Sequence, residues 1–219
     1  DYKAYYNQCK KDNSPALRDP NPVILLFPGV GLFSFAKNKQ TARVASEFYC
    51  NAINVMRGAE AISSYIALPL QEAFDIEYWL LEEAKLKRMP KEQSLSRKVA
   101  LVTGAGGGIG KSIAQKLASE GAVVGLLDIS ETNLNEALKD FSKDNAIGVV
   151  CDITHTKAIE DAIKKTCLAF GGVDIVVHSA GLAISKALSE TTTADWDLLQ
   201  DVLVKGQFEL FKKAANIVR

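Results

Sequence analysis

The sequence lacks several features that would assign it to a specialised class of protein. No apolar run reaches the ~20 residues that span a bilayer, and no signal peptide is visible. Basic and acidic residues balance at 26 each, so the charge indicates neither a nucleic acid nor an anionic membrane as partner. Internal repeats and low-complexity tracts are also absent. We therefore expect no nucleic-acid partner and no membrane association.

Cysteine and histidine are scarce, which limits redox and metal chemistry. The four cysteines lie far apart and form no CxxC pair: Cys9, Cys50, Cys151 and Cys167. We interpret them as reduced packing residues of a cytoplasmic protein. No histidine precedes His155, and the second histidine, His178, stands alone. A histidine-based metal site within residues 1–90 is therefore not expected, and neither histidine is predicted to be a metal ligand or a catalytic group.

Length and composition allow one large domain or two small ones. The chain has 219 residues, and 47% of them are apolar, which is enough for a substantial core. It begins at Asp1 instead of methionine. We interpret it as an internal piece of a longer polypeptide.

The most informative pattern covers residues 98–130. A strand-like apolar run at 99–102 leads into the turn TGAGGGIG at 103–110, within which helical spacing begins. A glycine suited to ending a helix follows, and then a second apolar run that stops at Asp128. The order is strand, glycine-rich turn, helix, strand and acid.

Such a unit is suited to holding a pyrophosphate. Glycines let phosphate oxygens approach the backbone, and the helix N-terminus offers unpaired N–H groups and partial positive charge. Asp128 would accept both ribose hydroxyls of an adenosine and would repel a 2′-phosphate, which favours NAD over NADP. Gly107, Ile129 and Ser130 supply no basic side chain that would reverse this preference.

Two other interpretations of the turn stay open at this point. The glycines can simply make a tight turn. Residues 105–112, AGGGIGKS, also match a relaxed Walker A motif, in which Lys111 would reach the β- and γ-phosphates and Ser112 would hold Mg²⁺. Under that alternative the protein is a P-loop nucleotide-binding protein that uses Gly110, Lys111 and Ser112.

The remaining pattern predicts two domains joined by a linker. Residues 1–21 are polar and irregular. A buried strand at 23–27 and a returning strand at 30–36 form a hairpin. Asn38 caps a helix over 39–63, and a further helix covers 70–88. Residues 91–97 are polar. Beyond them Ser130 caps a helix, and strand 146–150, helix 156–170, strand 173–178 and a long helix over 193–218 follow. This alternation predicts a parallel sheet. The expected boundaries are 1–90, the linker 91–97, and 98–219.

From Lys98 onward the chain resembles the short-chain dehydrogenase/reductase family. The residues that carry the resemblance are the TGxxxGxG turn, Asp128, Asp152-Ile153 and His178-Ser179-Ala180-Gly181. It implies an α/β fold with a Rossmann-type parallel sheet, helices on both faces and an incomplete C-terminus, preceded by a small, mostly helical α+β segment. It also implies that Asp152 faces the adenine amino group, with the Ile153 backbone beside it. Ser179-Ala180-Gly181 would line the ribose, with Ser179 in place of the family's asparagine. The full set expected at NAD is Gly104, Gly107, Gly108, Ile109, Gly110, Asp128, Ile129, Asp152, Ile153, Ser179, Ala180 and Gly181.

The upstream part resembles a narrower family of fusion proteins. The matching stretches are FPGVGLF at 27–33, KQTARVASEFY at 39–49, EAFDIEYW at 72–79 and LEEAKL at 81–86. They are similar to the bifunctional rhamnulose-1-phosphate aldolase/alcohol dehydrogenases, in which a class II aldolase domain precedes a short-chain dehydrogenase. The resemblance implies that residues 1–90 are the tail of the aldolase domain, and that the substrate is a small sugar-derived alcohol or aldehyde.

The catalytic groups that these families use are missing. Hydride transfer in the dehydrogenase family uses a serine and a YxxxK pair. The one YxxxK match in this sequence, Tyr6 to Lys10, precedes the first Rossmann strand, and we interpret it as coincidence. The family's relay asparagine falls on Leu203, and Pro28-Gly29 stands where the aldolase resemblance implies a His-Gly pair. We expect no catalytic residue and no metal ligand in this chain, which would bind cofactor without turnover.

A structural role is the third hypothesis. In the family, the helix that corresponds to residues 196–211 commonly packs against its copy in another subunit, which implies a homo-oligomer. Its apolar side chains suit either that interface or the sheet: Leu199, Val202, Leu203, Phe208 and Phe211.

Overall fold

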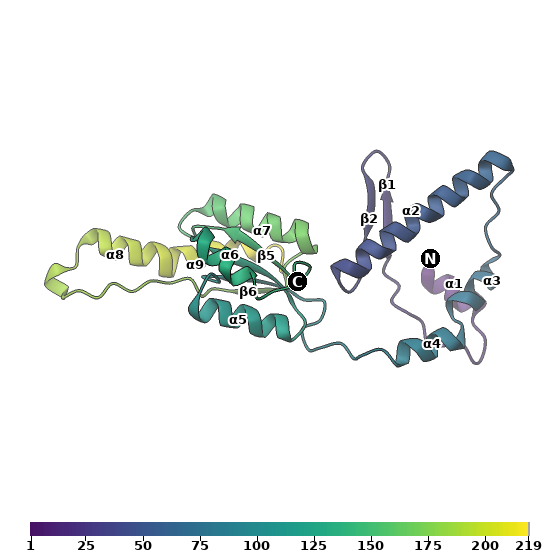
Figure 1. Cartoon of the computed structure of the whole chain (residues 1–219), viewed down its shortest axis with the longest axis horizontal. Helices are drawn as coiled ribbons and strands as arrows, with labels where there is room; N and C mark the ends of the chain where they lie inside the picture. The colour runs from purple at the N-terminus through teal and green to yellow at the C-terminus, as the bar shows by residue number, and fades with distance from the viewer. Residues whose placement is uncertain (219) are drawn as a thin grey trace. The chain divides into compact units, whose positions relative to one another are not determined.

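The computed structural model describes residues 1–218, and the chain divides into two compact units, Asp1–Lys91 and Glu92–Arg219. Figure 1 shows the second unit as a sheet covered by helices and the first as a looser set of helices with one hairpin. The second unit contains the glycine-rich turn.

The second unit is built on a four-stranded parallel sheet with the order β5-β4-β3-β6. Its strands are β3 (Val99–Thr103), β4 (Val123–Asp128), β5 (Ala146–Val150) and β6 (Ile175–Val177). β3 is fully buried because it lies in the middle of the sheet with helices on both faces. The α/β fold with a parallel sheet is thereby confirmed.

Helices cover both faces of this sheet (Figure 1). Ala100 and Val102 of β3 pack with α5 (Gly108–Ser119) and α6 (Glu131–Leu138), whereas Leu101 packs on the other face with α7 (Thr156–Phe170) and α9 (Gly206–Ala214). The alternation of side chains along the strand therefore divides the core into two layers. α8 (Thr193–Gln200) and a short 3₁₀ turn (Leu188–Glu190) complete the unit.

The strand order reverses direction at β3. The chain runs outward from β3 to β4 and β5, and then returns through α7 to β6 on the other side of β3. In open α/β sheets, ligands bind at the carboxyl ends of the strands where the order reverses in this way. The glycine-rich turn lies at that point, directly after β3.

Most of the predicted elements in this unit are confirmed, and two are not. Ser130 accepts a hydrogen bond from the Asn133 N–H, as expected of a helix cap. The expected strand 173–178 is shorter. The helix predicted over 193–218 ends at Ala214 and is not α-helical throughout, because a π-helical turn (Asp201–Lys205) lies between α8 and α9. α9 buries Gly206, Leu210 and Ala214 against the sheet, whereas α8 buries none of its residues, so only the second half is held in the core.

The first unit contains a hairpin of β1 (Ile24–Phe27) and β2 (Gly31–Ser34) beside α2 (Lys39–Ile62). Asn38 caps α2 by accepting from the Thr41 N–H, as predicted. The hairpin is also confirmed, but β1 is not buried, because Leu26 and Phe27 remain 53% and 51% exposed.

An aromatic cluster explains two further corrections. Residues 2–9, predicted to be irregular, form α1 (Tyr2–Cys9), and the helix predicted over 70–88 is divided into α3 (Leu70–Glu77) and α4 (Leu80–Lys87). Tyr78 ends α3, stacks on Phe74 with ring centroids 4.5 Å apart, and meets Tyr6 of α1 edge-on. The contact between Tyr6 and Tyr78 joins segments about 70 residues apart in sequence, which local patterns do not reveal.

Across residues 1–218, no helix is long and apolar enough to cross a membrane, and no three potential ligands gather as a metal site. The four cysteines are free thiols. Cys9 and Cys151 are buried and Cys167 is partly buried, but Cys50 is exposed on α2, so its prediction as a packing residue is wrong.

Candidate cofactor site

Two glycines in the turn are required by close backbone contacts. Gly104 adopts φ +64°, and a Cβ placed there would lie 2.8 Å from the Ala180 Cα. A Cβ on Gly110 would lie 2.2 Å from the Gly104 carbonyl oxygen. Neither contact can relax by rotating a side chain. The turn therefore packs directly against its own helix and against the loop after β6.

The middle of the turn faces open space. No atom lies within 4 Å of a Cβ placed on Gly107 or Gly108. Gly107 precedes the first residue of α5, and the Ile109 side chain is 75% exposed in the first helical turn. Free N–H groups at a helix N-terminus beside open space make a suitable position for an anion.

Asp128 connects this turn to the end of β4. Its Oδ2 accepts from the Gly106 N–H at 2.9 Å, and its Oδ1 accepts from the Ser130 N–H at 2.9 Å. A carboxylate oxygen can accept about two hydrogen bonds, so each oxygen retains capacity for another donor. A Cβ on Gly106 would lie 2.7 Å from the Asp128 Cγ, so Gly106 must be small for the carboxylate to reach the turn.

Thr103, the first residue of the TGxxxGxG turn, connects the turn to the loop after β6, and no role for its side chain was assigned from the sequence. Its side chain is fully buried, and its Oγ1 accepts from the Ser179 and Ala180 N–H groups, both at 3.1 Å. The His178 Nδ1 lies 3.2 Å from the same oxygen. A hydroxyl residue at the end of an apolar strand was the available signal, because a buried hydroxyl requires partners.

Asp152 and Ile153 follow β5, and their side chains have separate roles. Asp152 Oδ1 accepts from the Thr154 N–H and hydroxyl at 2.9 and 2.7 Å, and the His155 Nδ1 lies 3.3 Å from its Oδ2. Burial would raise the pKa of Asp152, but the hydrogen bonds from Thr154 and the nearby His155 outweigh it and lower the pKa. Ile153 is buried in the core, and a Cβ on Gly206 would lie 3.0 Å from its carbonyl oxygen.

The structure thus brings together the glycine-rich turn, Asp128 and the Ser179–Gly181 loop through hydrogen bonds and close backbone contacts, while Asp152 bonds within its own loop. Ile129 is 68% exposed next to Asp128. Leu203 lies beside this site, since its Cδ2 is 3.3 Å from the position of a Cβ on Gly181. Tyr6, the YxxxK tyrosine, lies in the first unit, where its hydroxyl donates to the Pro15 carbonyl at 2.7 Å.

The geometry does not favour the P-loop alternative. Lys111 Nζ lies 2.7 Å from Asp140 Oδ2 in an ion pair beyond α6, and this bond lowers the pKa of Asp140. Ser112 donates its hydroxyl to the Gly108 carbonyl of its own helix at 3.1 Å. A P-loop needs the lysine on the phosphates and the hydroxyl on Mg²⁺, and both groups are engaged elsewhere.

Comparison with known proteins gives the family. Residues 98–218 match the family model described as short chain dehydrogenase. The chain belongs to the short-chain dehydrogenase family. Among solved structures, it is similar to a short-chain dehydrogenase/reductase titled glucose/ribitol dehydrogenase from Brucella melitensis, with a TM-score of 0.56 and 27% identity over 59% of this chain and 55% of that one. A dehydrogenase/reductase from Sinorhizobium meliloti 1021 gives a TM-score of 0.50 and 36% identity over 55% of this chain and 49% of that one.

The upstream residues match a second model. Residues 1–86 match "Aldolase class II, second domain", which is consistent with a fusion. The uncharacterized oxidoreductase YuxG of Bacillus subtilis is 35% identical over 218 residues, which are 98% of this chain and 32% of that protein. An uncharacterized oxidoreductase of Staphylococcus saprophyticus is 42% identical over 116 residues, 51% of this chain and 49% of its own length. The chain therefore spans about a third to a half of these curated relatives.

Proposed function

We propose that the second unit of this short-chain dehydrogenase binds NAD for an oxidoreductase reaction. The observation that carries the proposal is the position of Asp128. Its carboxylate is fixed by the amides of Gly106 and Ser130, one oxygen to each, beside the N-terminus of α5. A carboxylate held in this way can accept the two ribose hydroxyls while the pyrophosphate lies at the open glycines.

The same carboxylate supports NAD over NADP. A 2′-phosphate would bring negative charge against Asp128, and the adjoining Gly107, Ile129 and Ser130 offer no cation to compensate. Lys111 belongs to the same helix end, but its ammonium is paired with Asp140. NAD supplies the hydride acceptor of the reaction, and the residues of this chain bind and orient it.

The remaining cofactor residues are assigned as follows. Gly107 to Gly110 and the first turn of α5 would hold the pyrophosphate. Asp152 and the backbone of Ile153 would contact the adenine, and the loop of Ser179, Ala180 and Gly181 would line the ribose. Gly104 supports this set from behind, because its close contact with Ala180 joins the turn to that loop.

A fluorescence titration tests the proposal. NADH added to the chain should enhance cofactor fluorescence with saturation, NADPH should bind more weakly, and ATP with Mg²⁺ should have no effect. Asp128→Ala should weaken NADH binding by roughly 10- to 100-fold, since two hydrogen bonds to a charged group are lost. Lys111→Met is the matched control and should leave NADH binding nearly unchanged. ATP binding without NADH binding would overturn the proposal in favour of a P-loop.

We further propose that the longer polypeptide couples this reaction to a class II aldolase domain of the rhamnulose-1-phosphate type. The match of residues 1–86 to an aldolase second domain supports the fusion, and the oxidoreductase name of YuxG is consistent with it. The substrate would be a small sugar-derived alcohol or aldehyde.

The chain itself should bind cofactor without turning over substrate. Its one YxxxK pair, Tyr6 and Lys10, lies outside the dehydrogenase unit, and Leu203 cannot move a proton. An assay should therefore find NADH binding without NADH oxidation when small aldehydes are added. Measurable oxidation would contradict this part of the proposal.

We also propose a cytoplasmic homo-oligomer. Trp196, Leu203, Phe208 and Phe211 of the α8–α9 segment are each 40% or more exposed, which provides an apolar surface for a second copy. Light scattering should find concentration-dependent dimers, and Phe208→Asp should reduce them. Leu168→Asp, on the exposed side of α7, is the control. A monomer at every concentration would remove this proposal.

A further inference from the structure

The Thr103 hydroxyl is surrounded by three polar atoms, and its valence determines what each of them does. The hydroxyl oxygen has two lone pairs and one hydrogen. The N–H groups of Ser179 and Ala180 both donate to Oγ1 at 3.1 Å, so they occupy the two lone pairs. The hydroxyl hydrogen is then directed at the third neighbour, the His178 Nδ1 at 3.2 Å.

This arrangement assigns the tautomer of His178. A nitrogen that accepts the Thr103 hydrogen cannot carry a proton itself, so Nδ1 is bare and Nε2 bears the hydrogen of the neutral imidazole. The opposite tautomer would direct an N–H at a hydroxyl oxygen whose lone pairs are already used. The imidazolium form would do the same, because both of its nitrogens carry hydrogen.

We infer that His178 is a positioning residue: as the neutral Nε2–H tautomer it takes the Thr103 hydroxyl hydrogen, and so fixes the Thr103 oxygen as the acceptor for the Ser179 and Ala180 amides. Those amides belong to the loop after β6, in which Ala180 lies against Gly104. The histidine therefore stabilises the contact between the glycine-rich turn and that loop.

The surroundings of the other ring nitrogen, Nε2, indicate that His178 does more than fill space. His178 Nε2 is buried and has no hydrogen-bond partner within residues 1–218. A buried donor without an acceptor is costly, and an apolar side chain of similar size would avoid that cost. In this structure, the hydrogen bond accepted at Nδ1 offsets the cost of the unpaired Nε2–H. An apolar side chain has no such acceptor.

The tautomer can be measured directly, because the chain has only two histidines. His155→Gln leaves His178 as the single imidazole, and ¹⁵N–¹H correlation spectra at neutral pH distinguish a protonated ring nitrogen from a bare one. We expect a bare Nδ1 and a protonated Nε2. A protonated Nδ1, or the averaged tautomers of a free imidazole, would overturn the inference.

Paired variants test whether the acceptor is what matters. His178→Asn keeps an oxygen that can accept from Thr103, whereas His178→Leu keeps the volume without an acceptor. Amide hydrogen exchange at Ser179 and Ala180 should be about five- to tenfold faster in the leucine variant, the loss of roughly one hydrogen bond. In the asparagine variant it should stay within about twofold of the parent. Equal exchange in both variants would mean that His178 only fills space, and would overturn the inference.

The hydroxyl partner supplies a second pair of variants. Thr103→Ser keeps the hydroxyl and should keep the tautomer, whereas Thr103→Val removes it and should leave the two tautomers mixed. If the valine variant does not fold, the spectrum of the parent and the comparison of His178→Asn with His178→Leu still test the inference. An unchanged tautomer in a folded Thr103→Val protein would show that another group sets it, and would overturn the inference.

The consequence for NAD binding rests on the proposed function, but the tautomer does not. His178→Leu should weaken NADH binding by about the same factor by which it accelerates exchange, because the loop must be ordered again on binding. If the chain does not bind NADH at all, the proposed function fails, and the spectra and exchange rates still test the role of His178.

Discussion

At the scale of single residues, the glycine-rich turn is shaped by what each glycine contacts. Gly106 and Gly107 are neighbours with opposite surroundings. A Cβ on Gly106 would meet the Asp128 carboxylate, whereas a Cβ on Gly107 would meet nothing within 4 Å. The φ of Gly107, −165°, is extended backbone that any residue adopts. The two positions therefore form a matched pair.

We predict that Gly106→Ala destabilises the chain by about 1–3 kcal/mol, because the new methyl group displaces Asp128 from its amide partners. Gly107→Ala should change the free energy of unfolding by less than about 0.5 kcal/mol. Urea unfolding of both variants measures the difference. Equal destabilisation would show that Asp128 is not confined by Gly106.

The lowered pKa of His178 predicts that the stability of the chain depends on pH. Burial lowers the pKa of His178 below its ordinary value of 6.5, so the folded state binds fewer protons than the unfolded state. The contribution of this group to stability is fully present above about pH 6.5 and is lost as the pH falls below that value.

Unfolding free energies on either side of about pH 6.5 should therefore fall more steeply on acidification in the parent than in His178→Asn, which has no titrating group at this position. His155→Asn is the control for the other histidine. Parallel pH profiles for the parent and His178→Asn would contradict the prediction.

Several roles at this scale follow from residue type, and others do not. TGxxxGxG and Asp128 could be singled out from sequence because glycine and a terminal acid have few alternative uses in that order. The role of Thr103 could not be recognised, because its three partners come from residues 178–180, about 75 positions away.

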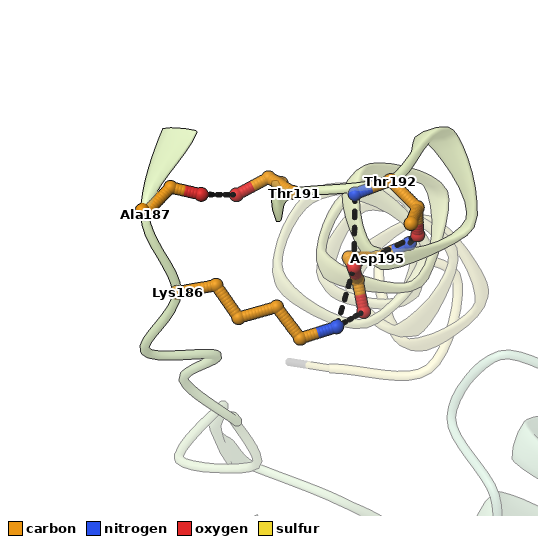
Figure 2. Close-up of polar contacts among 5 residues, drawn as sticks. All are labelled: Lys186, Ala187, Thr191, Thr192 and Asp195. Atoms are coloured by element: carbon orange, nitrogen blue, oxygen red, sulfur yellow. Dashed lines mark hydrogen bonds and ion pairs between the residues drawn. The ribbon is translucent and has the colours of Figure 1, made fainter. Parts of the chain in front are cut away.

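At the scale of elements, α8 begins with a complete cap. The Thr192 Oγ1 accepts from the Asp195 N–H at 3.1 Å, and Asp195 Oδ2 accepts from the Thr192 N–H at 3.0 Å (Figure 2). Lys186 adds an ion pair with Asp195, and these contacts lower the pKa of Asp195 to about 2. Because α8 buries none of its own residues, we expect its stability to depend strongly on this cap.

Thr192→Ala should therefore destabilise the first turn of α8 by about 1 kcal/mol. Amide exchange in that turn should accelerate by roughly fivefold, which is the rate factor that corresponds to about 1 kcal/mol. Thr191→Ala is the matched control, because its Oγ1 donates only to the Ala187 carbonyl and caps no helix amide (Figure 2). Similar exchange in the two variants would show that the cap does not hold α8.

Helix periodicity predicted elements well where one face packs on the sheet, as in α7, whose observed bounds, Thr156–Phe170, are those expected. It failed where distant contacts interrupt the helix. At the break after α3, Tyr78 meets the distant Tyr6 edge-on, and the π-helical turn precedes Gly206, where α9 approaches the Ile153 carbonyl closely. Neither contact leaves a mark in the local pattern.

At the scale of the whole molecule, residues 93–97 belong to the second unit and are bonded within it. Leu95 N–H donates to the Glu120 carbonyl at 2.9 Å, and the Gln93 side chain donates to the Ser119 carbonyl at 2.9 Å. The unit boundary falls between Lys91 and Glu92. The segment most accessible to a protease should therefore end before Gln93.

Limited digestion with trypsin should first cut after Arg88 or Lys91, and much more slowly after Arg97 or Lys98, which follow the bonded segment. Mass spectrometry of the early fragments measures this preference, and the larger product should retain NADH binding. First cleavage after Arg97 or Lys98 would place the boundary further along the chain.

The sequence by itself determined the parallel α/β unit, because alternating strands and amphipathic helices leave few other ways to bury their apolar faces. It also determined the glycine-rich turn and the acid after the next strand, since those residue types act through local backbone geometry. Only the tertiary structure decided that Lys111 pairs with Asp140, that Thr103 and His178 join the turn to the loop after β6, and where the helices break. Those features depend on contacts between residues distant in sequence, and such contacts exist only once the chain has folded.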